Sequence, residues 1–289
     1  LGDVYKRQIY ALLVDTWSDI FIGSYSGGID IARPVGSIAA IYMHQHNNTQ
    51  TLLNDHVNSV TQLSSSALAM GTDDGISVLN PLTGEWRHIA RDIVVLSLCP
   101  KPDGEGLLAA TYGNGVCEIS AKGEVRKLYG VDILGDNHIH DLLFDRNGHL
   151  WIGCQDAQLV EVMQGKFWYY PVDNVKSLAL LPDGRIAAGT IKGLYIVTPG
   201  QTKVKELPYF SSDPNQVNRY VLDLFIHDER YIDIATDGGG LYVYDLRNGN
   251  CRQFTMKDGL PSNTVTSVTQ DNLCLLYTSD AADDRISVD

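Results

Sequence analysis

The sequence has no run of lysine or arginine residues, and its 35 acidic residues outnumber its 22 basic ones. The resulting net charge of −13 argues against a surface that binds nucleic acid or an anionic membrane, so we expect no nucleic-acid partner. Helical periodicity is also nearly absent. The sequence has instead 27 glycines and many short apolar segments that alternate with polar residues, which is typical of short strands joined by tight turns.

Cysteine and histidine form no recognisable metal or redox motif. No CxxC pair is present, and no histidine stands at the spacing of zinc ligands. His138 and His140 would lie on one face of a strand, but no third ligand accompanies them. We therefore expect no metal and no cofactor. The sequence leaves open whether a disulfide joins any two of Cys99, Cys117, Cys154 and Cys251.

One sequence motif recurs along the chain. It consists of a strand that ends in a small residue followed by a hydroxyl or thiol residue, a turn that usually contains glycine, and a second strand. The hydroxyl or thiol residue marks each copy, at Ser24, Thr72, Thr111, Cys154, Thr190 and Thr236. These markers are 36 to 48 residues apart, and a β-only repeat of about 40 residues is typical of one four-stranded propeller blade. The sequence predicts an all-β propeller with six recognisable blades and the start of a seventh, which the intact protein would complete.

Each copy is associated with a short strand whose third residue is usually small or polar. These third residues are Ala11, Ser59, Val95, Asp141, Ser177, Asp223 and Ser267. We expect these strands to line the central channel, where the blades crowd together. We also expect the glycine of the recurring motif to allow close approach of the neighbouring blade. Because the seventh copy is cut short, we expect an unclosed ring with two exposed blade faces and low stability.

The two ends of the chain resemble translated DNA from library preparation. One DNA segment read on opposite strands can encode both residues 3–8 and residues 274–279, and it resembles the transposon end used to prepare sequencing libraries. We therefore interpret residues 1–8 and 274–289 as adaptor sequence and residues 9–273 as the propeller fragment. No signal peptide or membrane segment is visible, and no conclusion about location follows from the ends.

Two stretches resemble the two-component regulator propeller repeat. They are residues 145–153 (DRNGHLWIG) and residues 236–245 (TDGGGLYVYD), the latter followed by residues 258–265 (DGLPSNTV). The resemblance implies the extracytoplasmic sensor region of a hybrid two-component histidine kinase, of the kind with which gut bacteria such as Bacteroides sense oligosaccharides. It also implies a periplasmic location, adjoining propeller and β-sandwich domains, a homodimeric receptor, and kinase domains outside this chain.

Candidate ligand residues follow from the geometry of a propeller, in which the loops entering the first strand share one face with the loops between the second and third strands. On that face we expect a ligand site formed by Tyr25, Tyr112, Asn114, His138, Gln155, Lys192, Arg219 and Tyr220, with His56, Asp73 and Asp237 beside them. The set is mixed aromatic and polar, as a groove for a carbohydrate or a peptide would be. The simpler alternative is that these are ordinary solvated loop residues.

No catalytic motif stands out in the sequence. It has no nucleophile elbow, no phosphate-binding loop and no recognisable Ser-His-Asp order. Asp141 and Asp223 are the only acids on the predicted channel strands, and Arg219 is near in sequence to the second, so a propeller lyase or glycosidase remains an alternative. A protein-interaction scaffold is another, although the Gly-His and Trp-Asp pairs of WD repeats are missing. We expect a non-catalytic sensor region.

Overall fold

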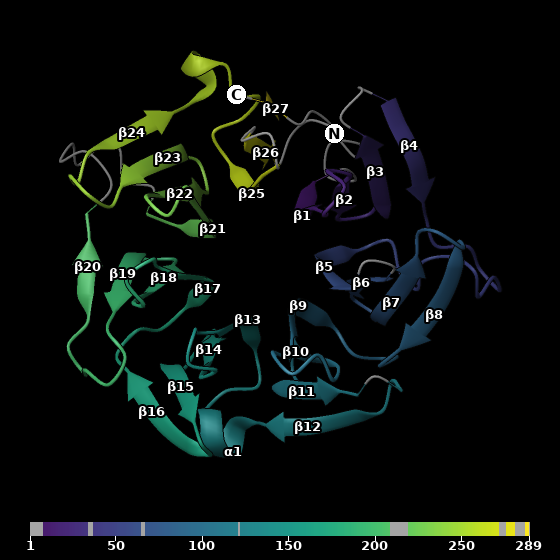
Figure 1. Cartoon of the computed structure of the whole chain (residues 1–289), viewed down its shortest axis with the longest axis horizontal. Helices are drawn as coiled ribbons and strands as arrows, with labels where there is room; N and C mark the ends of the chain where they lie inside the picture. The colour runs from purple at the N-terminus through teal and green to yellow at the C-terminus, as the bar shows by residue number, and fades with distance from the viewer. Residues whose placement is uncertain are drawn as a thin grey trace.

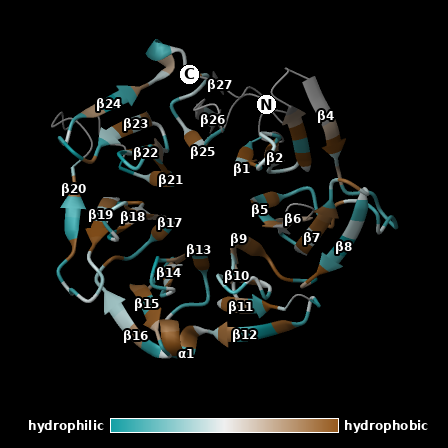
Figure 2. Ribbon diagram, viewed as in Figure 1, coloured by the Kyte–Doolittle hydropathy of each residue, from teal (hydrophilic) through white to brown (hydrophobic). Residues whose placement is uncertain are grey.

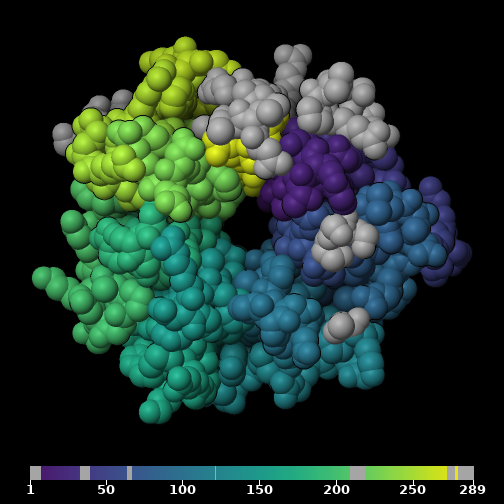
Figure 3. Space-filling model, viewed as in Figure 1, coloured from purple at the N-terminus to yellow at the C-terminus, as the bar shows by residue number. Residues whose placement is uncertain are grey.

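The computed structural model describes residues 8–33, 37–64, 67–120, 122–208, 219–271, 276–280 and 287–288. Seven antiparallel sheets stand around a central channel, and the chain visits them in order (Figure 1). The predicted fold class is confirmed, since six sheets have four strands and the seventh has three described strands. The channel stays open when all atoms are drawn (Figure 3). No helix in the described ranges is long and apolar enough to span a membrane.

The first three blades follow one plan, with an innermost strand beside the channel and three strands that run outward. Blade 1 contains β1 (Ile9–Val14), β2 (Ile20–Ser24), β3 (Ile29–Arg33) and β4 (Ser37–Tyr42). Blade 2 contains β5 (Val57–Ser64), β6 (Ala67–Thr72), β7 (Gly75–Asn80) and β8 (Glu85–Ile89). Blade 3 contains β9 (Val95–Pro100), β10 (Leu107–Thr111), β11 (Val116–Ile119) and β12 (Val125–Tyr129).

The remaining blades repeat this plan. Blade 4 contains β13 (Ile139–Phe144), β14 (Leu150–Cys154), β15 (Leu159–Met163) and β16 (Lys166–Tyr170). Blade 5 contains β17 (Val175–Leu180), β18 (Ile186–Thr190), β19 (Gly193–Val197) and β20 (Lys205–Leu207). Blade 6 contains β21 (Val221–His227), β22 (Tyr231–Thr236), β23 (Gly240–Asp245) and β24 (Cys251–Phe254). Blade 7 contains β25 (Val265–Gln270), β26 (Leu276–Asp280) and β27 (Ser287–Val288). One helical turn, α1 (Val131–Leu134), precedes blade 4, and a 3-10 turn, η2 (Met256–Asp258), precedes blade 7.

The marker residues end the second strand of each blade and pair with the first residue of the innermost strand. The pairs are Ile9–Ser24, Val57–Thr72, Val95–Thr111, Ile139–Cys154, Val175–Thr190 and Val221–Thr236. The predicted repeat is thereby confirmed. The predicted register of the innermost strand in blade 3 was wrong by two residues, because this strand begins at Val95 and its third residue is Ser97. The apolar run over residues 93–96 contains no polar residue that could fix the register.

Apolar side chains fill the layers between consecutive blades. The inner and middle strands carry most of them, whereas the outer strands β8, β20 and β24 are largely hydrophilic (Figure 2). Buried residues of one blade share an apolar cluster with the first residue of the next, as Phe21 of blade 1 does with Val57 of blade 2. Each blade therefore depends on both neighbours for the burial of its two faces.

The ring is closed at its inner circle. β25 lies beside β1, and the Thr266 hydroxyl donates a hydrogen bond to the carbonyl of Ile9. Our expectation of an unclosed ring was wrong, because the innermost strand of blade 7 is enough to join blade 6 to blade 1. Residues 276–280, which we interpreted as adaptor sequence, pair with β25 as β26. Their origin in an adaptor stays a prediction, since any alternating segment of suitable length can pair with an open strand edge.

Candidate functional site

Backbone contacts build one face of the propeller from two sets of loops. In blade 3, Thr111 Oγ1 donates to the carbonyl of Gly115 at 2.6 Å and so pins the hairpin between the second and third strands. The amide of Tyr112, the next residue, donates at 3.0 Å to the carbonyl of Val94, which precedes the innermost strand. Equivalent amide contacts recur in blades 1, 4 and 6. We call this surface the loop face.

An aromatic cluster on the loop face joins blade 1 to blade 2. The rings of Tyr25 and His56 stack with centroids 4.0 Å apart, and Tyr10 meets Tyr25 edge-on at 5.5 Å. His56 Nδ1 lies 2.7 Å from Asp73 Oδ2, and the other oxygen of Asp73 accepts a hydrogen bond from Asn58 at 2.8 Å. The structure thus brings three predicted loop-face residues together, with Tyr10 and Asn58 added from the innermost strands.

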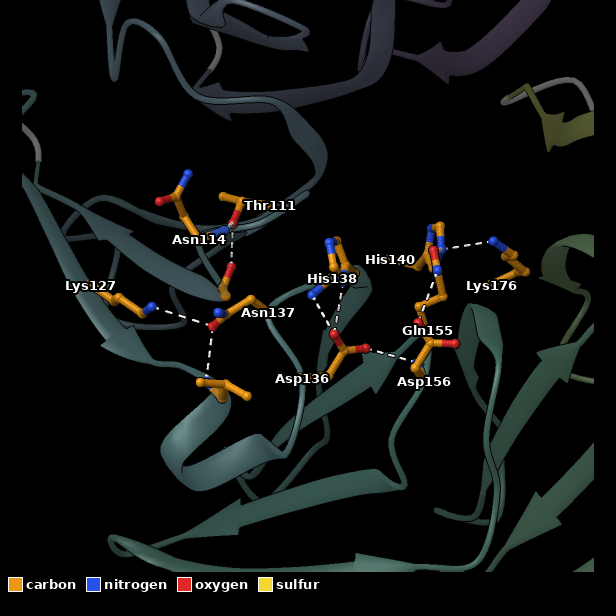
Figure 4. Close-up of polar contacts among 12 residues, drawn as sticks. Thr111, Asn114, Lys127, Asp136, Asn137, His138, His140, Gln155, Asp156 and Lys176 are labelled. Atoms are coloured by element: carbon orange, nitrogen blue, oxygen red, sulfur yellow. Dashed lines mark hydrogen bonds and ion pairs between the residues drawn. The ribbon is translucent and has the colours of Figure 1, made fainter.

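A second aromatic contact joins blade 3 to blade 4. The half-exposed ring of Tyr112 lies on His138 with centroids 4.4 Å apart. The buried carboxylate of Asp136 orients this pair, because it contacts His138 Nδ1 at 2.9 Å and accepts the backbone amide of Asp156 at 2.8 Å (Figure 4). Asn114 stands beside them, and its backbone amide donates to the hydroxyl of the marker threonine at 3.1 Å.

A polar cluster at the channel lies next to this contact. His140 on β13 places its Nε2 3.1 Å from Gln155 Oε1 and 2.7 Å from the ammonium of Lys176 on β17 (Figure 4). Burial and the charge of Lys176 lower the pKa of His140 to about 4, so the imidazole is neutral near pH 7. Burial also lowers the pKa of Lys176. Gln155 was predicted for the site, whereas the sequence argument missed Lys176 because no motif marks it.

Other predicted residues lie further around the ring. Lys192 of blade 5 is tied to Asp173 at 2.8 Å, and Arg219 before blade 6 is 3.6 Å from Glu206. Tyr220 accepts the backbone amide of the residue after the blade 6 marker at 3.0 Å. These contacts of the three residues lie on blades 5 and 6, so the predicted set divides into separate groups. The geometry places the richest group at Tyr112, His138, His140, Gln155 and Lys176.

The channel carboxylates connect blades. Asp141 accepts a hydrogen bond from Ser97 Oγ of blade 3 at 2.8 Å and one from the amide of Leu178 of blade 5 at 2.8 Å. Asp223 accepts bonds in the same way from serines of blades 5 and 7, at 3.2 and 2.9 Å. Their lone pairs are thus used to hold innermost strands together. Arg219, the arginine that the alternative of a lyase or glycosidase would place beside them, lies 3.6 Å from Glu206.

Two triads of possible metal ligands bring their ligand atoms within 4.8 Å of one another: Asp136, His138 and Asp156, and Asp145, His149 and Glu161. In the first, both oxygens of Asp136 already accept hydrogen bonds from its two partners, so a cation would have to displace them. In the second, Asp145 Oδ1 accepts the amides of Asn147 and His149 and closes a turn. The four cysteines between residues 9 and 273 are free thiols, which answers the question of a disulfide.

A cavity of about 630 Å³ on blade 6 was not predicted from the sequence. His227, Tyr231, Arg252 and Phe254 are among the residues that line it. It lies toward blade 7, since Phe254 also packs on the apolar cluster shared with β25. His227 Nδ1 contacts Asp233 Oδ2 at 2.7 Å, and Asp233 is fully buried. The other oxygen of Asp233 has no hydrogen-bond partner among the described residues.

With this geometry established, a comparison with protein families identifies one segment. Residues 133–156 match the family described as Two component regulator propeller. This segment is similar to a two component regulator propeller repeat. It runs from α1 through β13 and β14 and carries Asp136, His138, His140 and Gln155, so the resemblance predicted from the sequence is confirmed in the blade that holds the richest cluster. No curated protein sequence matches the chain.

Solved structures show the same fold. Two are extracellular domains of proteins from B. thetaiotaomicron described as hybrid two component systems, with 18% and 22% identity and TM-scores of 0.78 and 0.68. The matches cover 98% and 92% of this chain but only 38% and 37% of those chains, so this chain spans less than two fifths of their length. A third is virginiamycin B lyase from Staphylococcus aureus, with 12% identity, a TM-score of 0.76 and coverage of 96% and 93%.

Proposed function

We propose that this chain is a non-catalytic, ligand-sensing propeller in the periplasmic part of a membrane-bound hybrid two-component sensor. It detects an oligosaccharide and passes the signal to a histidine kinase outside this chain. The observation that carries the proposal is the regulator propeller repeat of residues 133–156, which contributes His138 and His140 to the loop face. The fold shared with two extracellular domains of hybrid two component systems supports it.

The chemistry of the loop face suits a carbohydrate. Tyr112 and Tyr25 present rings that are partly exposed, and the apolar faces of sugar rings pack on such surfaces. Around them stand hydrogen-bonding groups, of which Gln155 and Lys176 are two, that can orient sugar hydroxyls. The absence of turnover is supported by the channel carboxylates, whose oxygens accept hydrogen bonds from neighbouring strands. A sugar bound here would be held by stacking and hydrogen bonds without a paired acid and base.

Signal transfer requires that the ligand distinguish two states of the receptor, because a ligand with equal affinity for both shifts neither. We propose that the bound oligosaccharide contacts the loop face and favours one relative placement of two protomers. The adjoining propeller and β-sandwich domains of the same chain would carry this placement to the membrane. The coupling is then a difference in binding free energy between two arrangements of a homodimer.

A glycan panel tests the proposal. Oligosaccharides of dietary and host origin are titrated into the protein by calorimetry, and the same samples are analysed for products. Saturable binding of one oligosaccharide without a new product is the expected result. Turnover would instead favour a propeller lyase or glycosidase, which shares this fold with virginiamycin B lyase. Failure of every glycan to bind would contradict the sensor and leave the protein-interaction scaffold.

A further inference from the structure

The innermost strands share an irregularity that the repeat pattern does not reveal. In every blade the strand pairing skips one residue, the second of the innermost strand, which forms a β-bulge between the first and third residues. The skipped residues are Tyr10, Asn58, Leu96, His140, Lys176, Leu222 and Thr266. A bulge residue is free of the ladder, and bulges commonly re-aim a side chain next to a functional site.

Three of these bulge residues meet the loop face at the channel. Tyr10 contacts Tyr25, Asn58 contacts Asp73, and His140 contacts Gln155, so each reaches a loop residue of the face. The neighbouring positions of the strand repeat from blade to blade, whereas the bulge position differs in almost every blade. We call the seven bulge residues the channel rim. The rim is the part of the repeat where sequence variation can change what the face binds without changing the fold.

Lys176 is the one lysine or arginine of the channel rim, and its ammonium group faces an imidazole nitrogen instead of a carboxylate. Its ammonium lies 2.7 Å from His140 Nε2. The charge of the Asp156 carboxylate raises the pKa of Lys176, but burial outweighs this effect, and none of the ion pairs among the described residues includes Lys176. The same nitrogen of His140 lies 3.1 Å from Gln155 Oε1. A neutral imidazole nitrogen either donates or accepts, so it cannot donate to the amide oxygen and accept from the ammonium at once.

The orientation of Gln155 is fixed from the other side. Its Nε2 donates to Asp156 Oδ2 at 3.2 Å, so its oxygen must face His140. His140 then satisfies Gln155 by donating, which leaves the ammonium of Lys176 facing an N–H group. An anionic oxygen placed beside Lys176 would remove this conflict, because the ammonium could turn to it while His140 keeps its bond to Gln155. Burial of this cation costs free energy that the charge of Asp156 offsets only in part, since the pKa of Lys176 is still lowered, and an anionic ligand would offset more of that cost.

We propose that Lys176, beside His140 on the channel rim, binds the carboxylate or sulfate group of an acidic sugar. The inference rests on the proposed sensor function and narrows its ligand to an anionic oligosaccharide. Tyr112 and His138, whose ring centroids lie 4.4 Å apart, would hold an adjacent sugar ring. The net charge of the chain is −13, so Lys176 is a local positive charge and not part of a general basic surface. A preference for acidic glycans would therefore come from this site.

Matched pairs of glycans test the inference. Each pair has an acidic member and its neutral counterpart: trigalacturonate and galactotriose, a sulfated disaccharide and its desulfated form, and a sialylated trisaccharide and lactose. We expect at least one acidic member to bind about 10- to 100-fold more tightly than its counterpart, as one charge-assisted hydrogen bond provides. Lys176→Met should remove that preference and Lys176→Arg should keep part of it. Lys166→Met, which removes an exposed charge from the outer strand β16, is the control and should change nothing.

The outcomes separate this inference from the proposed function. Equal binding of both members of every pair, or an acidic preference that survives Lys176→Met, would overturn the inference and leave the sensor in place. Binding of an acidic member followed by its cleavage would support the Lys176 site and overturn the non-catalytic function. Absence of binding by every glycan would overturn both. Melting temperatures of the three variants within a few degrees of the parent would show that a loss of binding is local.

Discussion

Gly189 of β18 lies directly against Val221, the first residue of the next innermost strand. A Cβ atom at position 189 would stand 2.4 Å from Val221 Cγ1, far inside van der Waals contact. The same relation joins Gly153 to Val175 at 2.7 Å. Glycine at this place in the repeat therefore sets how closely one blade approaches the next, as its position in the sequence predicts. The tight fit lets apolar side chains of both blades fill a shared layer without voids.

Gly189→Ala is the direct test of this contact. The added methyl group overlaps Val221, and relief requires that two blades separate, so we expect a loss of about 1–3 kcal/mol in the free energy of unfolding. Val221→Ala removes the atoms that clash, and the double variant should therefore be more stable than the sum of the single effects predicts. Urea unfolding followed by tryptophan fluorescence measures all three. Additive effects would show that the two side chains do not meet.

Asp141 and Ser97 illustrate a different kind of contact between blades, in which a carboxylate in the channel replaces apolar packing. Burial of the carboxyl group away from water raises the pKa of Asp141 to about 6, and the charge of Asp223 acts in the same direction. The hydrogen bonds from Leu178 and Ser97 act against this but are outweighed. The side chain nevertheless keeps some contact with the channel, which limits the energetic consequence.

The pH dependence of stability follows from that shift. The folded protein holds the proton of Asp141 up to about pH 6, whereas the unfolded chain releases it near pH 4. Between these values the folded state binds more protons, so the contribution of Asp141 to stability falls as the pH rises and is constant above about pH 6. Asp141→Asn cannot ionise. The variant should therefore gain about 1–2 kcal/mol relative to the parent between pH 4 and pH 7. Parallel stability curves in urea across that range would contradict the assignment.

The repeat could be predicted from the sequence because its markers act locally. Thr111 and Thr236 bond within their own hairpins, so each copy carries the whole signal. The register of blade 3 could not be predicted, since it depends on the pairing of Val95 with Thr111 across a loop. The open ring was a wrong expectation for a related reason. A single hydrogen-bonded strand, β25, closes the inner circle, and its contact with β1 joins residues from opposite ends of the chain.

The candidate site could be predicted only in part. Propeller geometry indicates which loops share a face, and the structure puts Tyr112 beside His138 as that rule allows. No sequence pattern indicates which loops of adjacent blades touch, because the contact depends on the side-chain direction in both. Lys176 was missed because it occupies the variable position of the strand pattern, and the bulge that redirects it leaves no mark in the sequence.

The buried pair of His227 and Asp233 departs from the repeat in blade 6. In blades 2 and 5 the corresponding residues are apolar: Leu63 with Ala69, and Leu181 with Ala187. The hydrogen bond to Asp233 raises the pKa of His227, which favours the charged imidazolium beside the carboxylate. Removal of one partner leaves the other buried without compensation, whereas replacement of both by apolar residues does not.

His227→Leu should therefore cost about 3 kcal/mol in the free energy of unfolding, because the carboxylate of Asp233 is fully buried. The double variant His227→Leu/Asp233→Ala copies the pair found in blade 5 and should be more stable than His227→Leu alone. Chemical unfolding of the parent and the two variants measures the difference. A double variant no more stable than His227→Leu would contradict the coupling of the pair.

Tyr112 offers the sharpest test of the loop face, because its ring is half exposed and packs on the ring of His138. Tyr112→Ala should weaken the tightest glycan of the panel about fivefold, which corresponds to about 1 kcal/mol for one stacked ring. Tyr112→Phe keeps the ring and should bind within about twofold of the parent, since stacking does not need the hydroxyl.

Leu82→Ala, a truncation of an exposed side chain in the turn between β7 and β8, is the matched control and should not change affinity. Calorimetric titration of the three variants with one glycan gives the comparison. Equal losses for Tyr112→Ala and Leu82→Ala would place the binding surface elsewhere on the ring.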